Sequence, residues 1–82
     1  MMSESLDQAA TVQRIILNGK HGPYAVASLK RDKESVFVTF SLSQPVWRED
    51  GLPEEGNIVI LKDIRKKKAG WRAYIASFVR LQ

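Results

Sequence analysis

Apolar and polar residues alternate most regularly over residues 34–42. One side of a strand with a period of two residues is wholly apolar there, and it comprises Val36, Val38, Phe40 and Leu42. The other side holds serine and threonine except at Phe37. The pattern predicts a strand whose second face presents one large aromatic ring. A neighbouring loop covers that ring, or the ring is free to meet a partner.

Four further segments have the composition of strands, namely residues 12–17, 24–29, 57–64 and 71–81. Turn residues separate them, with Asn-Gly after the first segment and a charged turn at residues 30–33. The last segment also fits a helical period. Its β-branched and aromatic content, and the glycine before it, favour a strand.

Two stretches do not fit a strand. Residues 1–11 are polar and show no sustained apolar period, which predicts a flexible tail with at most one helical turn at residues 6–10. Residues 43–56 contain two prolines and two glycines, which excludes a regular element across them. Trp47 is the large side chain of this long loop. It either fixes the loop onto the core or presents a ring to a ligand.

Five strands with almost no helix predict an all-β fold. An open sheet of this size exposes its edges, so closure into a small barrel is the economical solution. We therefore expect a five-stranded OB-like barrel, with an SH3-like barrel as the alternative. The barrel is expected to span residues 12–82 as one domain, after the tail.

Composition narrows the functional classes. The 82 residues include no cysteine and a single histidine, His21, so neither a disulfide nor a metal site is expected, and no other cofactor is implied. No nucleophile has a visible base partner, and we expect no enzymatic activity. No apolar run approaches the ~18 residues of a membrane span, and the N-terminus has no secretory signal pattern. A cytoplasmic monomer is the expectation.

The positive charge of the chain indicates a polyanion as the class of partner. The net charge is +4, and residues 11–82 alone hold thirteen basic and seven acidic residues, a net charge of +6. The densest cluster is residues 65–68, with Trp71 and Arg72 close by. On a hairpin tip these residues would follow a phosphate backbone, and the alternative is a charged turn that only aids solubility. Lys20 and His21 extend the cluster if both loops lie on one side of the barrel.

The order of these segments resembles the cold-shock domain, a five-stranded OB barrel that binds single-stranded RNA and DNA. Residues 36–40, Val-Phe-Val-Thr-Phe, are similar to that family's second ribonucleoprotein motif, V-F-V-H-F. The resemblance implies stacking roles for Phe37 and Phe40, with Thr39 in place of the histidine. Residues 20–26 stand at the first motif, K-G-F-G-F-I, and residues 52–59 and 70–73 resemble the entries to strands four and five.

The chain lacks several of the aromatic residues that the family has at its stacking positions. Ile16 and Leu17 stand where the family has an aromatic pair, and Pro23 and Ala25 stand where it has two phenylalanines. Since each stacked base contributes about 1–3 kcal/mol, these losses would weaken binding greatly. Either Tyr24, Trp47 and Trp71 rebuild the platform, or the barrel has another role.

Two functions follow. The first is a module that holds single-stranded RNA or DNA and so disfavours RNA secondary structure, as an RNA chaperone does. The candidate binding residues are Lys20, His21, Tyr24, Phe37, Thr39, Phe40, Trp47, Arg65, Lys66, Lys67, Lys68, Trp71 and Arg72. The second is a protein-interaction or assembly barrel, such as a component of a ribonucleoprotein complex, anchored by Trp47, Trp71 and Phe37.

Overall fold

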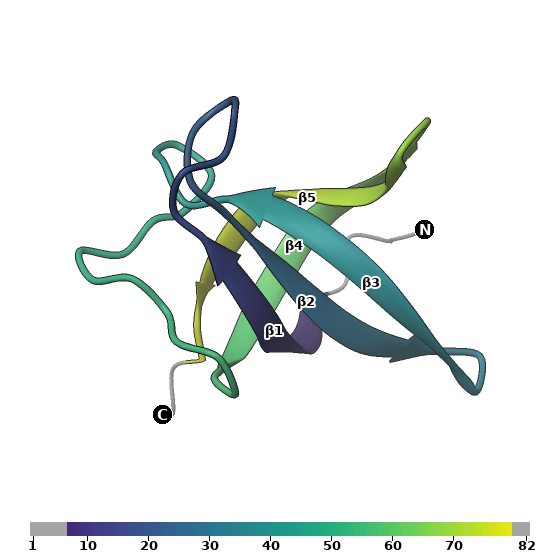
Figure 1. Cartoon of the computed structure of the whole chain (residues 1–82). Coiled ribbons are helices and arrows are strands. Elements are labelled where there is room, and N and C mark those ends of the chain that lie inside the picture. The colour runs from purple at the N-terminus through teal and green to yellow at the C-terminus, as the bar shows by residue number, and fades with distance from the viewer. Residues whose placement is uncertain (1–6, 80–82) are drawn as a thin grey trace.

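The structure is a computed structural model that describes residues 7–79. Five strands close into a barrel in the order β1-β2-β3-β5-β4 (Figure 1). The strands are β1 (Gln8–Ile16), β2 (Tyr24–Arg31), β3 (Glu34–Ser41), β4 (Ile58–Lys67) and β5 (Gly70–Phe78). Neighbours are antiparallel except β3 and β5, which are parallel. The prediction of an all-β five-stranded barrel is confirmed, and the arrangement is consistent with an OB-like barrel.

No helix occurs within residues 7–79, so none there is long and apolar enough to cross a membrane. The helical turn expected at residues 6–10 is wrong for residues 8–10, which are strand, while Leu6 lies outside the described residues.

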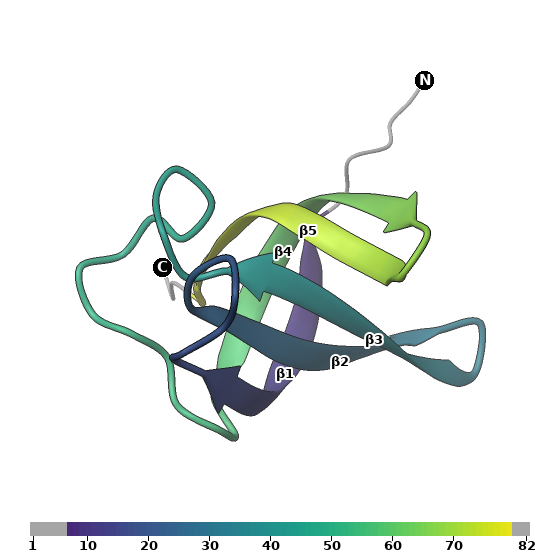
Figure 2. The same ribbon diagram turned by 45° about the horizontal axis from the view of Figure 1, so that its top comes forward.

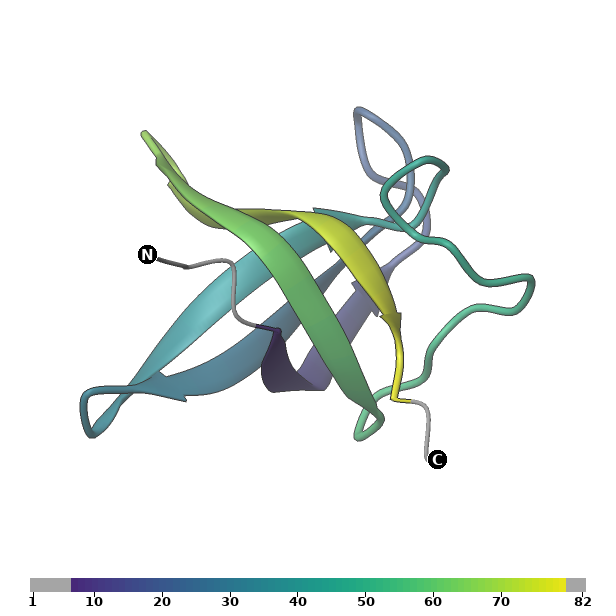
Figure 3. The same ribbon diagram turned by 180° about the vertical axis from the view of Figure 1, so that it is seen from behind.

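The first strand begins at Gln8 rather than at residue 12, so the boundary predicted for the tail is wrong over residues 8–11. These residues pair with β4 from Gln8 opposite Leu61 to Thr11 opposite Ile58, and this ladder closes the barrel (Figure 3). Ala10 is 3% exposed and belongs to the core. The polar residues Gln8 and Thr11 give no apolar pattern that would predict a strand here, because pairing with β4 rather than apolar composition stabilises this part of β1.

The core lies inside the barrel and follows the alternation of β2 and β3. Val38 and Phe40 point inward together with their partners Ala27 and Ala25 across the ladder. Small residues at Ala25, Ala27, Ala73 and Ala76 leave room for the large side chains of the opposite wall.

The loop from Leu42 to Asn57 is fixed onto the barrel by Trp47, which is 2% exposed. Its ring stacks on Phe40 at 5.9 Å between centroids and meets Phe78 edge-on at 4.9 Å. Its Nε1–H donates to the Gly51 carbonyl at 2.7 Å. Of the two roles left open by the sequence, anchoring of the loop is the one observed.

The alternation of β4 and β5 shifts at Asp63, which has a φ of 56°. Before this point Val59 and Leu61 point into the core, and beyond it Ile64 packs against the core. On β5 the buried residues are Ala73 and Ala76, which lie three positions apart, so the inward face of this strand also changes around Tyr74. Beyond the shift, the β4–β5 hairpin extends away from the barrel next to β3 (Figure 2).

Candidate nucleic-acid interface

The outer face of β2, β3 and β5 carries the only predicted stacking ring that is widely exposed among the described residues. Phe37 is 61% exposed, so no loop covers it. It lies opposite Ser28 on β2, and the next outward position on β3 is Thr39. Thr39 pairs with Arg72 on β5, so one surface continues from Phe37 across the β3–β5 junction.

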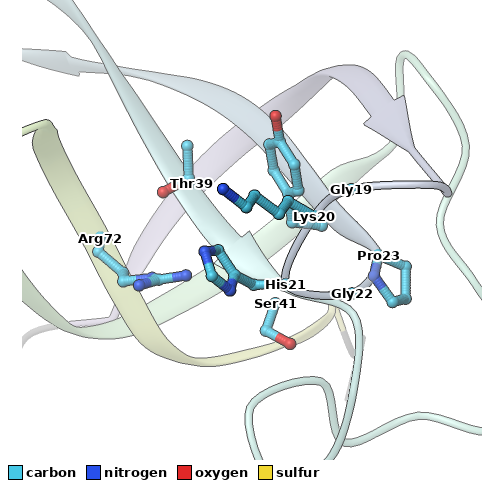
Figure 4. Close-up of a pocket in the computed structure, with 9 residues that line it drawn as sticks. Gly19, Lys20, His21, Gly22, Pro23, Thr39, Ser41 and Arg72 are labelled. Carbon is cyan, nitrogen blue, oxygen red and sulfur yellow. The ribbon is translucent and has the colours of Figure 1, made fainter.

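A first hollow of about 320 Å³ lies beside this surface (Figure 4). Residues 19–23 of the β1–β2 loop form one wall. Tyr24, Thr39 and Ser41 line it from β2 and β3, and Arg72 lines it from β5. The hollow therefore combines one phenol ring, two aliphatic hydroxyls and several nitrogen-bearing side chains, which is the chemistry of a site for a polar, anionic ligand.

The loop that forms the wall is held in place by its own backbone. Gly22 N–H donates to the Gly19 carbonyl at 3.1 Å, and Leu42 N–H donates to the Pro23 carbonyl at 3.0 Å. A Cβ at Gly19 would lie 2.5 Å from the Gly22 oxygen and 2.9 Å from the Tyr24 ring. Gly22 has a φ of +103°, a conformation that favours glycine. The wall is thus formed before any ligand arrives.

Cationic side chains meet in this hollow without acidic partners. Figure 4 shows the Arg72 guanidinium pointing towards the His21 imidazole, with the Lys20 amine on the same side of the loop. Among residues 7–79, no carboxylate lines the hollow. None of these three side chains makes a hydrogen bond or ion pair with a residue in the described range 7–79. Two full positive charges, on Lys20 and Arg72, are therefore available to an anion.

A second hollow of about 200 Å³ shares Thr39 and Arg72 with the first. It extends onto the β4–β5 hairpin, where Lys67 and Trp71 line it. The Thr39 hydroxyl donates to the Trp71 carbonyl at 3.4 Å, which ties the two strands together at this point. The two hollows form one basic track across β3 and β5.

The Trp71 ring does not share the face of Phe37. Trp71 pairs with Val38, an inward residue, and its ring packs against the core. Two cations lie over it, Arg31 at 4.7 Å and Lys66 at 5.0 Å from the ring centroid. The Trp71 ring therefore packs under the cations of the β4–β5 hairpin and does not add a second exposed ring beside Phe37.

Tyr74 organises the outer side of the same hairpin. Arg65 lies 4.6 Å and Lys67 lies 5.5 Å from its ring centroid. Arg65 also donates two hydrogen bonds of 3.0 Å to the Asp63 carboxylate, and this pair raises the pKa of Arg65 above its ordinary value. Asp63 thereby neutralises part of the positive charge that the sequence assigns to residues 65–68.

The structure brings together five of the predicted site residues around the first hollow: Lys20, His21, Tyr24, Thr39 and Arg72. Lys67 and Trp71 line the second hollow, and Phe37 is exposed on β3. Lys66 lies over Trp71, Arg65 is held by Asp63, and Lys68 is exposed at the hairpin turn.

Two predicted contacts are wrong. Phe40 is 0% exposed and Trp47 is 2% exposed, so neither ring can stack on a base at the surface. Phe40 is buried because it shares the inward face of β3 with Val38. Trp47 is buried because the loop folds back over the end of the barrel, where Arg48 N–H donates to the Ala76 carbonyl at 3.2 Å.

Several residues that line the first hollow or take part in the cation–π contacts of the β4–β5 hairpin were not predicted from the sequence, namely Gly19, Gly22, Pro23, Arg31, Ser41 and Tyr74. Period two alone places Ser41 on the face of Thr39 and Tyr74 on the face of Arg72, so the sequence held a signal for both. The contact of Arg31 with Trp71 follows from the parallel pairing of β3 and β5, which no local pattern encodes.

Comparison with known proteins finds no family model, no curated protein and no solved structure that matches this chain. The likeness to the cold-shock domain therefore rests on the short motifs in the sequence. Within residues 7–79, no three His, Cys, Asp or Glu side chains gather as a metal ion would require.

Proposed function

We propose that this protein binds single-stranded nucleic acid, RNA or DNA, on the outer face of β2, β3 and β5. The observation that carries the proposal is the pair of cations Lys20 and Arg72, which have no ionic partner among residues 7–79 and lie on the same face as the exposed ring of Phe37. Cations track phosphates and an exposed ring stacks on an unpaired base, so the two together fit a single strand.

The distribution of charge supports this face. The basic track runs from the β1–β2 loop through Arg72 to Lys67. Glu49, Asp50, Glu54 and Glu55 all belong to the β3–β4 loop, which lies at the other end of the barrel from the β4–β5 hairpin (Figure 1). The hairpin is therefore the part of the track that lies furthest from these carboxylates, whereas the β1–β2 loop lies at the same end of the barrel as the β3–β4 loop.

The proposed mechanism involves no chemistry. A base stacked on Phe37 is held out of a duplex, and phosphates on the basic track keep the strand extended. Holding bases unpaired disfavours RNA secondary structure, as in an RNA chaperone, and this is also what the likeness to the cold-shock domain implies. This chain has fewer stacking rings than that family, so we expect it to bind each nucleotide more weakly.

A fluorescence titration tests the proposal. Trp71 borders the second hollow and reports on a ligand there, whereas Trp47 is buried and contributes a constant background. Unstructured single-stranded RNA, then DNA, is added at low and at physiological salt, with a duplex of equal charge as the control. We expect saturable quenching by the single strands at both salt concentrations, and weaker quenching by the duplex.

Quenching that disappears at physiological salt would show attraction between charges without stacking, and would contradict the proposed role of Phe37. No binding at either salt concentration would overturn the proposal and direct attention to a protein partner for the exposed face.

A further inference from the structure

We propose that the first hollow, between the β1–β2 loop and Arg72, receives the terminal phosphate of a single strand. This inference rests on the proposed function and adds which part of the strand this site recognises: a phosphomonoester end rather than an internal phosphodiester.

The charge of the hollow fits a monoester. Lys20 and Arg72 supply two positive charges, His21 supplies two ring nitrogens, and no carboxylate from the described part of the chain lines the hollow to offset them. An internal phosphodiester carries one negative charge, while a terminal phosphomonoester carries up to two and offers three acceptor oxygens. The guanidinium of Arg72 matches phosphate oxygens with paired N–H donors.

The shape of the hollow fits the end of a chain. The β1–β2 loop closes the side away from Arg72, and its backbone hydrogen bonds and the packing of Gly19 on Tyr24 hold that wall in place. The second hollow adjoins the Arg72 side. A strand lying along the track past Lys67 therefore meets a wall after Arg72.

The size of the hollow fits one terminal nucleotide. At about 320 Å³ it is near the lower bound of about 300 Å³ for small-ligand sites. The Tyr24 ring gives an apolar surface for a sugar or base, and the hydroxyls of Thr39 and Ser41 line the same space. A longer run of nucleotides would have to continue over Arg72 onto the hairpin.

The test compares three eight-nucleotide single strands of one sequence: one with a 5′-phosphate, one with a 3′-phosphate and one with hydroxyls at both ends. Affinity is measured by Trp71 quenching with the full chain at low salt. We expect one of the phosphorylated strands to bind about fivefold more tightly than the hydroxyl strand. Which strand does so identifies the recognised end.

Charge-removing variants locate the effect. Lys20→Gln and Arg72→Gln should each reduce the ratio between the phosphorylated and hydroxyl strands towards one. Lys33→Gln removes the same charge at the exposed β2–β3 turn, away from both hollows, and should leave the ratio unchanged.

Equal affinity of all three strands would overturn the terminal-phosphate site while leaving single-strand binding intact. A preference that Lys20→Gln and Arg72→Gln do not reduce would also overturn it, because the phosphate would then bind elsewhere. Failure of all three strands to bind would instead contradict the proposed function itself.

Discussion

Phe37 and Phe40 lie three positions apart on β3 and face opposite sides of the sheet. Phe40 fills the barrel and stacks on Trp47, whereas Phe37 is 61% exposed. Within a single strand, one ring therefore stabilises the core and the other is the ring that we propose to stack on a base.

Phe37→Ala should raise the Kd for a single-stranded oligonucleotide about fivefold to a hundredfold, since one stacked base contributes about 1–3 kcal/mol. Its urea midpoint should change little, because the lost ring is exposed. Phe40→Ala is the matched control, and it should lower the free energy of unfolding by about 3–5 kcal/mol. An unchanged Kd for Phe37→Ala would rule out stacking at this position.

The sequence made conflicting predictions for Phe40, and the structure decides between them. Alternation placed Phe40 in the core with Val38, while the family motif placed it on a stacking platform. Alternation is right because it reports the face of the strand directly. For Trp47 neither signal sufficed, since its burial depends on where residues 43–56 fold back onto β5.

At the scale of elements, the β1–β2 loop and the β4–β5 hairpin define the two ends of the basic track. Their places in the chain were predictable from turn residues and charge. Their approach across β3 was not, because it depends on the parallel pairing of Thr39 with Arg72, residues far apart in sequence. The change in the inward face of β4 at Asp63, which alters the direction of the hairpin, could not be predicted from the sequence either.

Gly19→Ala should displace the β1–β2 loop, since the added Cβ would lie 2.5 Å from a backbone oxygen. We expect a loss of about 1–3 kcal/mol in unfolding free energy and weaker oligonucleotide binding. Gly51→Ala is the control, because a Cβ there meets nothing within 4 Å. Urea unfolding and the Kd measure both effects, and equal behaviour of the two variants would count against a tightly packed loop.

Asp63→Asn should free Arg65 for phosphate while keeping the left-handed backbone, which asparagine tolerates. Affinity for a single strand should rise, and the slope of log K against log salt should steepen by about 0.7 for one added phosphate contact. Asp32→Asn removes the same charge at a similar φ in the β2–β3 turn. If both variants steepen the slope equally, net charge rather than Arg65 is responsible.

For the molecule as a whole, closure of the barrel depends on residues that the sequence assigned to a tail. The strand content and the closed all-β architecture were predictable from period two and from the need to remove sheet edges. The contribution of residues 8–11 was not, because two alanines and two polar side chains give no apolar period.

Ala10→Asp tests this closure. The substitution places an unpaired charge at a buried site beside β4 and should destabilise the fold by more than about 3 kcal/mol. Ala9→Asp, one residue earlier and exposed, should change stability by less than about 0.5 kcal/mol. Urea denaturation of both proteins measures the difference. Similar midpoints would mean that β1 does not close the barrel at this point.

The junction of β3 and β5 has a consequence for the dynamics of the barrel. Within the described residues these strands pair at Val38 with Trp71 and at Thr39 with Arg72, whereas β2 and β3 pair along their whole length. So short a ladder is where the cylinder should open most readily, and its amide hydrogens should exchange early with solvent. Thr39 and Arg72 also border both hollows, so a ligand in either hollow would contact both strands of this short ladder. A ligand bound in either hollow would then slow that exchange and stabilise the whole barrel against opening.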